Sequence, residues 1–214
     1  MERRLAAFFE DEESRGLAER VAPYELFEAQ ARALAETGVL EGGSLLYLSP
    51  TGSGKSLLGE AAMIPVLRES GIVWWLAPTR ALARERAGTL AEVLGPEGFR
   101  VVATSRDERA ADEDIRTGRV DVVVAVYEKA QVLFLQSPAL RQAARLVVAD
   151  EIQLARDRDR GPGVELLLTL FRRQERPPQV IALAAELGEP EEFARRYGLQ
   201  IAGTEDRPVA LREG

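Results

Sequence analysis

Three residue types are missing from this 214-residue sequence: cysteine, histidine and asparagine. Without cysteine, the chain has no disulfide framework and no thiolate ligand for a metal ion. Without histidine, it also lacks the commonest metal ligand and the usual base at neutral pH. Any catalysis must therefore depend on carboxylates, hydroxyls, lysine, arginine or a metal ion that a ligand holds.

Long apolar runs are missing as well. No stretch of the sequence approaches the roughly 18 apolar residues that are needed to span a bilayer. The N-terminal residues 1–4 lead into a charged stretch rather than into the apolar core of a signal peptide. We therefore expect a cytoplasmic protein that has no membrane partner.

The chain is acidic, with a formal net charge of −7. This balance argues against a surface that is basic all over, although it is compatible with a local strip that binds nucleic acid. The length predicts one domain or two small ones. The 46% of hydrophobic and 29% of charged residues are typical of a globular protein with a sizeable core.

Short apolar runs alternate with amphipathic stretches along the chain. Six runs have the composition of strands that are buried on both faces of a parallel sheet. The six runs are residues 44–48, 72–76, 100–104, 121–126, 146–149 and 180–184. Helical periodicity is clearest in residues 56–68, 80–94 and 165–173. The alternation predicts an α/β fold with a doubly wound, mainly parallel sheet that is flanked by helices.

A glycine-rich segment, residues 49–56, lies directly after the first predicted strand and directly before a helix. A phosphate-binding loop requires this position. Gly52 and Gly54 allow backbone N–H groups to approach an anion, and Lys55 adds a compact positive charge. Ser56 can offer its hydroxyl to Mg²⁺. The predicted nucleotide contacts in this loop are Thr51, Gly52, Ser53, Gly54, Lys55 and Ser56.

The alternative for this segment is a Gly/Ser turn that carries a lysine by chance. The chain has only two lysines and uses arginine elsewhere. A lysine at position 55 supplies a flexible point charge where arginine would supply a planar fork. This choice favours the phosphate-binding interpretation, even though Ser49 stands where the strict motif begins with glycine.

An acidic pair, Asp150 and Glu151, follows the predicted strand at residues 146–149. Such pairs are often helix caps or turn residues. Together with a phosphate loop upstream, however, the pair predicts a magnesium and catalytic site. Asp150 is expected to hold the metal, and Glu151 is expected to orient or deprotonate the attacking water, because no histidine is present.

The ordered set of motifs resembles superfamily 2 helicases of the DEAD/DEAH type, and most of all their Ski-like and archaeal repair branch. Five segments and one residue carry the resemblance from about residue 24 to the end of the chain. They are residues 49–56 (motif I), 77–83 (motif Ia), 126–130 (the segment after the next strand), 150–153 (motif II), 207–211 (the link into a second motor domain) and Gln30 (the adenine-reading glutamine).

The resemblance implies the N-terminal RecA-like motor domain of an ATP-dependent DNA or RNA helicase. Its cofactors would be ATP and Mg²⁺, and its partners would be single-stranded DNA or RNA and a second RecA-like domain. Residues 1–39 would be a helical preamble, residues 40–202 the RecA-like domain, and residues 203–214 a linker towards the second domain. Lys55, Glu151 and Gln153 would be the catalytic residues.

The carboxyl ends of parallel strands share one edge of a sheet, where ligands bind. Several polar side chains follow the predicted strands, and there they can contact phosphates without reading the base sequence. The nucleic-acid candidates are Arg80, Thr104, Ser105, Tyr127 and Lys129. The sequence leaves open whether Tyr127 stacks on a base or packs in the core, and whether Arg80 is simply solvated.

Two positions depart from the family pattern. Gln153 replaces the usual histidine at the fourth place of motif II. The second departure is residues 184–186, Ala-Ala-Glu, which fall where motif III normally reads Ser-Ala-Thr. In the family, motif III links hydrolysis to strand movement. A second class therefore remains open, an ATP-responsive binding module with a degenerate motor. A third, a P-loop enzyme such as a small-molecule kinase, is disfavoured because it does not explain Gln30, residues 77–83 and residues 207–208 together.

Overall fold

The computed structural model describes residues 3–107 and 110–204. Its centre is a sheet of seven strands in the order β3-β4-β2-β5-β6-β1-β7, and every pair of neighbouring strands is parallel. The strands are β1 (Leu45–Leu48), β2 (Ile72–Ala77), β3 (Val101–Thr104), β4 (Val122–Val126), β5 (Ala144–Ala149), β6 (Gln179–Ala184) and β7 (Gln200–Gly203). The predicted doubly wound α/β fold is confirmed.

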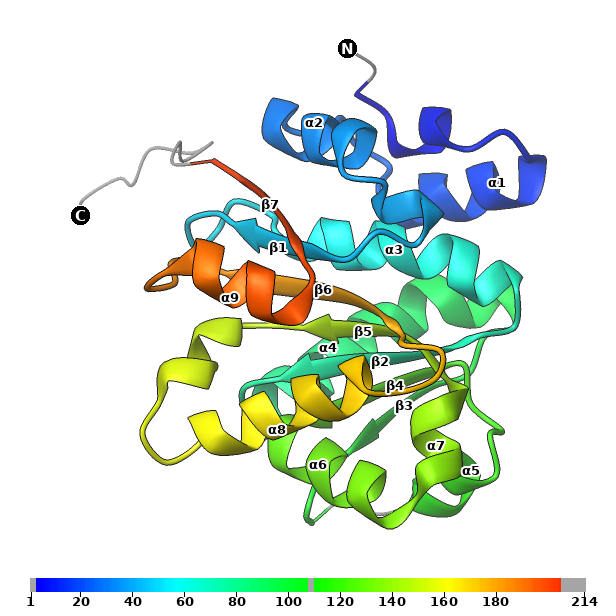
Figure 1. Ribbon diagram of the computed structural model, residues 1–214. Coiled ribbons are helices and arrows are strands. Elements are labelled where there is room, and N and C mark those ends of the chain that lie inside the picture. The colour runs from blue at the N-terminus through cyan, green and yellow to red at the C-terminus, as the bar shows by residue number, and fades with distance from the viewer. Residues whose placement is uncertain (1–2, 108–109, 205–214) are drawn as a thin grey trace, which may run out of the picture.

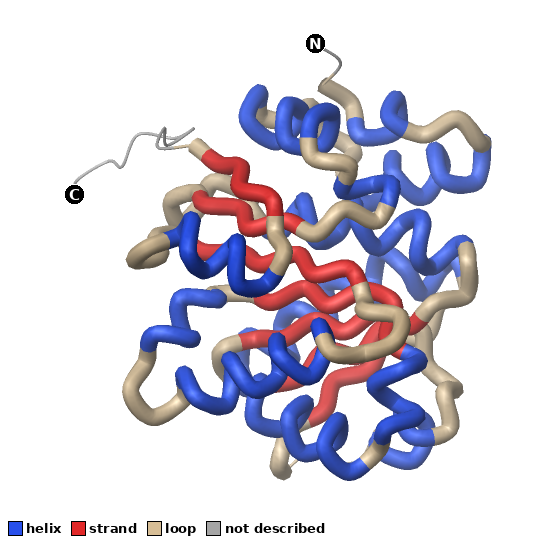
Figure 2. Tube along the Cα trace, viewed as in Figure 1, coloured by secondary structure: helices blue, strands red, loops and turns tan. Residues whose placement is uncertain are grey.

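Helices cover both faces of the sheet (Figures 1 and 2). The α-helices are α1 (Glu12–Val21), α2 (Glu28–Glu36), α3 (Ser56–Arg68), α4 (Arg80–Leu94), α5 (Asp112–Arg116), α6 (Tyr127–Gln136), α7 (Pro138–Ala143), α8 (Gly161–Arg172) and α9 (Pro190–Tyr197). The 3-10 turns are η1 (Leu5–Phe8), η2 (Val39–Glu41), η3 (Gly95–Glu97) and η4 (Ile152–Arg156). None of the helices in the described residues is long and apolar enough to cross a membrane.

The sheet separates two hydrophobic cores, because successive side chains of a strand point to opposite faces. Trp75 of β2 packs in the core shared with α1 to α4, whereas its neighbour Trp74 packs in the core shared with α5 to α9. Both indoles are fully buried. Continuous apolar strands in the sequence are thus explained by helices that cover both faces of the sheet.

The N-terminal residues join the first of these cores. Leu5 and Leu17 are buried in the same cluster as the apolar residues of α3, and the Arg3 Nε donates a hydrogen bond of 3.0 Å to the Leu26 carbonyl. Figure 1 shows α1 and α2 above α3, on the side of the sheet where the chain begins. The segment that leads to Gln30 is therefore held against the helix that follows the phosphate loop.

The six strands predicted from the sequence are all present, with bounds that differ by at most two residues. The helices at residues 56–68 and 80–94 have the predicted bounds. The helix predicted at residues 165–173 is α8, which begins four residues before the predicted start. Strand β7 was not predicted, because its four residues lie at the sheet edge and form no buried apolar run. The predicted link at residues 207–211 lies outside the described residues.

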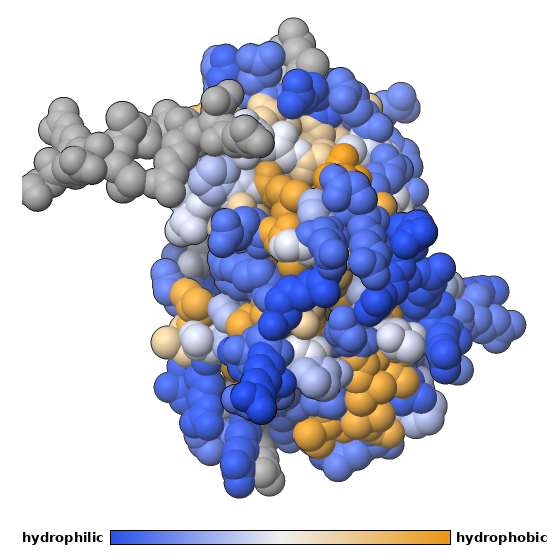
Figure 3. All heavy atoms as spheres, turned by 60° about the vertical axis from the view of Figure 1, so that its left-hand side comes forward, coloured by the Kyte–Doolittle hydropathy of each residue, from blue (hydrophilic) through white to orange (hydrophobic). Residues whose placement is uncertain are grey.

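The outer surface is mainly hydrophilic, with smaller apolar areas between the charged side chains (Figure 3). Large apolar side chains that remain exposed include Val132 and Leu135 on α6 and Leu166 on α8. Scattered exposure of this kind is normal for a globular protein.

Candidate nucleotide site and nucleic-acid face

Four loops meet at the carboxyl edge of the sheet. They follow β2, β5, β6 and β1, which are four consecutive strands of the sheet. The loop after β1 is anchored there, since the Ser49 N–H donates a hydrogen bond of 3.0 Å to the Ala184 carbonyl of β6. Likewise the Asp150 N–H donates one of 3.0 Å to the Leu76 carbonyl of β2. The sheet thus brings motifs I and II together, as ligand sites of open parallel sheets require.

The loop at residues 49–55 has the backbone that close approach to an anion requires. Gly52 has a φ of 82° and Gly54 a φ of 72°, a left-handed conformation that other residues adopt only at a cost. A Cβ on Gly54 would also lie 2.8 Å from the Gln30 Nε2. The loop runs directly into α3, so N–H groups and the positive end of a helix dipole face the same space.

Two buried hydroxyls of this loop are unpaired. Among the described residues, no hydrogen-bond partner is found for the Ser49 Oγ or the Ser53 Oγ, although both atoms are buried. Unpaired buried polar groups are costly in a folded protein. Together with the backbone conformation at Gly52 and Gly54, the hydroxyls fit a loop whose polar groups are completed by a bound phosphate.

Lys55 and Glu151 form the central contact of the site. The Lys55 Nζ lies 2.7 Å from the Glu151 Oε1, and the lysine side chain is only 9% exposed. The second carboxylate oxygen of Glu151 accepts a hydrogen bond from the Gln153 Nε2. A buried lysine charge needs a partner, and in this structure Glu151 is that partner. All three predicted catalytic side chains are thus brought into one chain of contacts.

The acidic pair at the end of β5 is arranged around a turn. Glu151 has a φ of 53°, and its N–H donates a hydrogen bond of 3.0 Å to the Asp150 Oδ1. Burial raises the pKa of Asp150, and the neighbouring Glu151 carboxylate raises it further, while Lys55 and Arg86 oppose the increase. A carboxylate in this position gains from an added cation, which is the property a metal ligand needs.

The described residues do not form a metal cage by themselves. No group of three or more histidine, cysteine, aspartate or glutamate side chains that could hold a metal ion occurs in the part of the chain that the structure describes. Mg²⁺ is usually bound by one or two carboxylates together with phosphate oxygens and water. The Ser56 hydroxyl and the Asp150 carboxylate therefore fit a metal ion that arrives with a nucleotide.

Ser56 is in contact with an arginine that was not predicted from the sequence. Its Oγ accepts a hydrogen bond of 2.8 Å from the Arg86 Nη2 of α4. The other side of the same guanidinium lies 2.5 Å from the Glu60 Oε1 of α3. Burial raises the pKa of Glu60, and Arg86 opposes the increase. Both residues lie on helices that were predicted, but helical periodicity gives no signal for a contact between two helices.

Gln30 is placed beside the phosphate loop, where its amide is fully used. The Gln30 Oε1 accepts a hydrogen bond from the Phe27 N–H, and the Nε2 donates to the carbonyls of Ser53 and Gly54 at 3.2 and 2.9 Å. The residue is 2% exposed. In this structure Gln30 braces the loop and does not present a free amide to a base. The exposed aromatic side chain at this place is Phe27.

Three of the five predicted nucleic-acid contacts are buried. Thr104 is 0% and Ser105 is 2% exposed, and the Thr104 Oγ1 donates to Asp112 beneath the surface. Tyr127 is 3% exposed, and its hydroxyl donates to the Asp150 carbonyl at 2.7 Å. The expectation that these residues line a surface strip is wrong, because α5 and α6 pack over the strand ends. Of the two alternatives for Tyr127, packing in the core is the one observed.

Arg80 and Lys129 do share one surface. Both line a hollow of about 890 Å³ at the ends of β2 and β4. The cationic side chains that line it in the described residues are Arg80, Arg106, Arg116, Lys129 and Arg160. The Lys129 side chain is only 9% exposed and pairs with Asp112 at the base of the hollow, whereas the Arg80 side chain is 56% exposed and pairs with Asp107. Two carboxylates, Asp112 and Glu128, line the same hollow, so cations are in excess there and several of them are paired. Its role as a nucleic-acid contact stays a prediction.

Arg160 ties this hollow to the segment that follows motif II. Its Nη2 donates to the Pro78 carbonyl at 2.8 Å, and its Nε donates to the Glu128 carboxylate at 2.7 Å. Because Pro78 lies two residues before Arg80, Arg160 connects the loop after η4 with the loop after β2. This contact was not predicted from the sequence, since 82 residues separate its partners.

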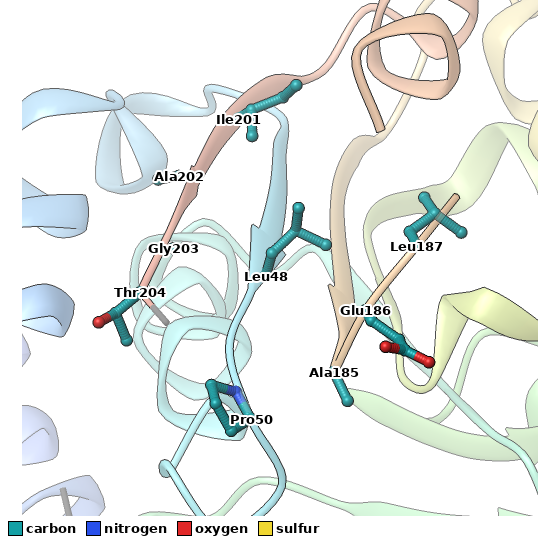
Figure 4. Close-up of a pocket in the computed structure, with 9 residues that line it drawn as sticks. All are labelled: Leu48, Pro50, Ala185, Glu186, Leu187, Ile201, Ala202, Gly203 and Thr204. Carbon is teal, nitrogen blue, oxygen red and sulfur yellow. The ribbon is translucent and has the colours of Figure 1, made fainter. Parts of the chain in front are cut away.

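The segment at motif III borders a separate hollow of about 650 Å³. Its walls come from the ends of β1, β6 and β7 (Figure 4). Ala184 is fully buried at the end of β6, and Glu186 is exposed at the hollow. Position 184 thus has no hydroxyl to offer, and position 186 offers a carboxylate. The departure from the usual motif is therefore a real change in the chemistry of this edge.

A parallel sheet in this strand order, with a phosphate loop after β1 and an acidic pair after β5, defines a RecA-like P-loop domain. The family model for DEAD/DEAH box helicases matches residues 27–193. The chain therefore belongs to the DEAD/DEAH box helicase family. Nucleotide use is a property of that family, and the P-loop chemistry described above agrees with it.

Curated relatives support the same assignment. The chain is 39% identical over 193 residues to the ATP-dependent DNA helicase Hel308 of Thermococcus kodakarensis, covering 89% of this chain and 16% of that protein. It is 34% identical to the Hel308 of Methanocella arvoryzae over 194 residues and 35% identical to that of Pyrococcus abyssi over 191 residues. Both alignments cover 89% of this chain and 26% of the relative. The chain thus spans about a quarter or less of these proteins.

Proposed function

We propose that this chain is the ATP-binding motor domain of an ATP-dependent DNA helicase, in which hydrolysis of Mg-ATP is coupled to movement along nucleic acid. One observation carries the proposal: Lys55 of the phosphate loop lies 2.7 Å from Glu151 of the acidic pair. The contact joins the group that binds phosphate to the group that activates water. DNA is preferred to RNA because the relatives described above are named DNA helicases.

The phosphate loop and Lys55 hold the phosphates of ATP in this proposal. Backbone N–H groups at the start of α3 supply donors, and Lys55 neutralises part of the phosphate charge. Ser56 and Asp150 would hold Mg²⁺, which when bound neutralises charge on the phosphate oxygens. Once Lys55 is engaged with phosphate, Glu151 is free to orient or deprotonate water, and Gln153 keeps its carboxylate in place.

A second RecA-like domain is the proposed partner of this chain. In related phosphoryl transfers an arginine finger from a partner is worth about 10³ to 10⁵ in rate. The catalytic residues proposed for this chain include no such group. We therefore expect the purified 214-residue protein to hydrolyse ATP very slowly and not to unwind a duplex, and robust unwinding by it would contradict this expectation.

Single-stranded DNA is the proposed occupant of the basic hollow around Arg80 and Lys129. Cationic side chains there contact the phosphate backbone, which positions a strand without reading its sequence. The hollow lies along the same sheet edge as the nucleotide site, and Arg160 and Tyr127 connect the two through the Pro78 and Asp150 carbonyls. This arrangement gives a physical route by which nucleotide and DNA can affect each other.

Binding of a fluorescent ATP analogue with Mg²⁺ tests the nucleotide site. Lys55→Ala should lose binding by at least a factor of about 100, because a charge-assisted contact to phosphate is removed. Arg173→Ala is the matched control, since it removes one exposed positive charge outside the phosphate loop and the basic hollow, and its fold is checked by circular dichroism. Binding that does not depend on Lys55 would overturn the proposal.

Salt-dependent binding of single-stranded DNA tests the hollow. Arg80→Ala should weaken binding at every sequence and reduce the slope of log K against log salt by about 1. Arg195→Ala, on the exposed side of α9, should leave the slope unchanged. Equal effects of the two substitutions would mean that DNA binds by general charge and not in the hollow.

One observation favours the alternative of an ATP-responsive binding module: residues 184 and 186 carry no hydroxyl. The double change Ala184→Ser and Glu186→Thr in the full-length protein separates the two functions. A gain of DNA unwinding would indicate a motor that has lost its coupling and now binds in response to ATP. Unwinding that is already present and does not change would favour a helicase that works without those hydroxyls.

A further inference from the structure

The guanidinium of Arg86 is held on three sides next to the proposed metal ligand. Its Nη2 donates to the Ser56 Oγ at 2.8 Å, and its Nη1 lies 2.5 Å from the Glu60 carboxylate. Its carbon lies 4.5 Å from the centre of the Trp75 ring, within the range of a cation–π contact. Because Trp75 is fully buried, the platform beneath the guanidinium is rigid.

This geometry restricts the Ser56 hydroxyl. A serine hydroxyl has one proton and two lone pairs, whereas a guanidinium only donates. Arg86 therefore occupies one lone pair, and the hydroxyl proton has to point away from it. The remaining lone pair is available to a cation. Its direction is fixed by the hydrogen bond from Arg86, because the hydroxyl can no longer rotate freely.

The positive charge of Arg86 is offset in place. The guanidinium and Asp150 line the same small hollow of about 140 Å³, so an uncompensated charge would repel a metal ion there. Glu60 lies one helical turn after Ser56 and pairs with Arg86, with side-chain exposures of 15% and 22%. A partly buried pair of this kind is screened little by solvent. The Arg86 charge still acts on Asp150, whose pKa it lowers, and Glu60 reduces the net charge that a metal ion meets there.

We propose that Arg86 is a positioning residue that orients the Ser56 hydroxyl for a divalent cation, and that Glu60 neutralises Arg86 so that this cation is not repelled. The inference rests on the proposed function, since it assumes that Mg²⁺ arrives with a nucleotide. It predicts that substituting Arg86 reduces the gain in nucleotide affinity that Mg²⁺ produces. Nucleotide affinity without Mg²⁺ should stay unchanged.

The test compares binding of fluorescent ADP in EDTA and across a Mg²⁺ titration. For Arg86→Met, affinity in EDTA should stay within about two-fold of wild type, while the increase produced by Mg²⁺ should fall about 10-fold, equivalent to 1.4 kcal/mol. Glu60→Gln should also reduce the Mg²⁺ effect, because it leaves Arg86 unneutralised. Arg86→Lys should restore part of the effect, and Arg84→Met, an exposed arginine of the same helix, should have none.

Three results would overturn the inference. The first is a Mg²⁺ effect in Arg86→Met that equals that of wild type. The second is an equal loss in EDTA and in Mg²⁺, which would mean that Arg86 only supports the loop structurally. The third is a stronger Mg²⁺ effect in Glu60→Gln. If Mg²⁺ does not raise the ADP affinity of the wild-type protein, the proposed function is contradicted. That result differs from a change seen only in the Arg86 or Glu60 variants, so the two failures are distinguishable.

Discussion

Lys55 and Glu151 are 96 residues apart in the sequence and form an ion pair of 2.7 Å at the centre of the site. Each side chain is therefore the other's counter-ion in this structure. In the proposed function a phosphate of the nucleotide competes with Glu151 for Lys55, and the same exchange frees Glu151 for water. Under that proposal nucleotide binding and activation of the base are coupled through one contact.

Glu151→Gln tests this competition. Glutamine keeps the shape of the side chain and removes its charge. Lys55 then loses the ion pair that competes with phosphate for its ammonium group. We expect ATP-analogue affinity to rise about 3- to 10-fold, or about 0.7 to 1.4 kcal/mol, while ATP hydrolysis falls. Titration with the fluorescent analogue measures the first effect, and Glu175→Gln, an exposed carboxylate, is the control. Unchanged or weaker binding in Glu151→Gln would show that the pair does not oppose phosphate.

The elements that the sequence predicts well are those with a local signal. The strand that ends at Ala149 is apolar throughout, and residues 49–56 sit between a strand and a helix, so both halves of the nucleotide site were expected at one edge. Thr104 and Ser105 follow a strand in the same way, but whether such a residue is covered depends on how α5 packs. That packing leaves no periodic trace in the sequence.

Contacts between helices are the other part that sequence reasoning did not reach. The Arg86–Glu60 pair joins α4 to α3, and the Gln30 amide joins α2 to the phosphate loop. Arg86 and Glu60 each have the sequence context of an ordinary polar position on a helix, and Gln30 was expected to read adenine, not to brace the loop. Only the three-dimensional packing of the helices against β2 and β1 brings such partners together.

A substitution of Gln30 distinguishes two roles for its amide: support of the phosphate loop and recognition of the base. If the amide mainly holds the carbonyls of Ser53 and Gly54, Gln30→Ala should weaken ATP and GTP analogues by the same factor, about 10-fold, which matches the loss of buried hydrogen bonds. Competition titrations with both nucleotides measure the ratio, and Gln200→Ala on the exposed edge strand is the control. A selective loss of ATP binding would instead show that Gln30 reads the base.

Gln179 is predicted to be a stability determinant at the start of β6. Its Nε2 donates to the carbonyls of Val39 and Gly43 at 2.6 and 2.8 Å, and the residue is 8% exposed. Gln179→Leu leaves both carbonyls without this donor, and it should cost about 1–3 kcal/mol in the free energy of unfolding. Urea denaturation measures the loss, and Gln200→Leu, on an exposed position of β7, should change stability far less.

Asp114 should make the protein more sensitive to acid. Its carboxylate accepts hydrogen bonds from Arg119 at 2.8 and 3.1 Å and also contacts Arg100, and these partners lower its pKa, with the Arg119 hydrogen bond as the largest cause. A carboxyl whose folded pKa is lowered contributes stability above its unfolded pKa, and that stability is lost as the pH falls through the folded pKa. For Asp114 this loss begins near the ordinary value of 3.8 and is complete below the folded value.

Asp114→Asn removes this contribution, so the variant should melt at a lower temperature than wild type at pH 7. The difference should shrink below about pH 4 and vanish when the wild-type carboxyl is protonated. Thermal melts from pH 7 to pH 3 in low salt measure the trend, and Asp159→Asn, an exposed aspartate after η4, provides the matched control. A difference in melting temperature that stays constant with pH would mean that the charge of Asp114 does not stabilise the fold, because only a charge effect disappears on protonation.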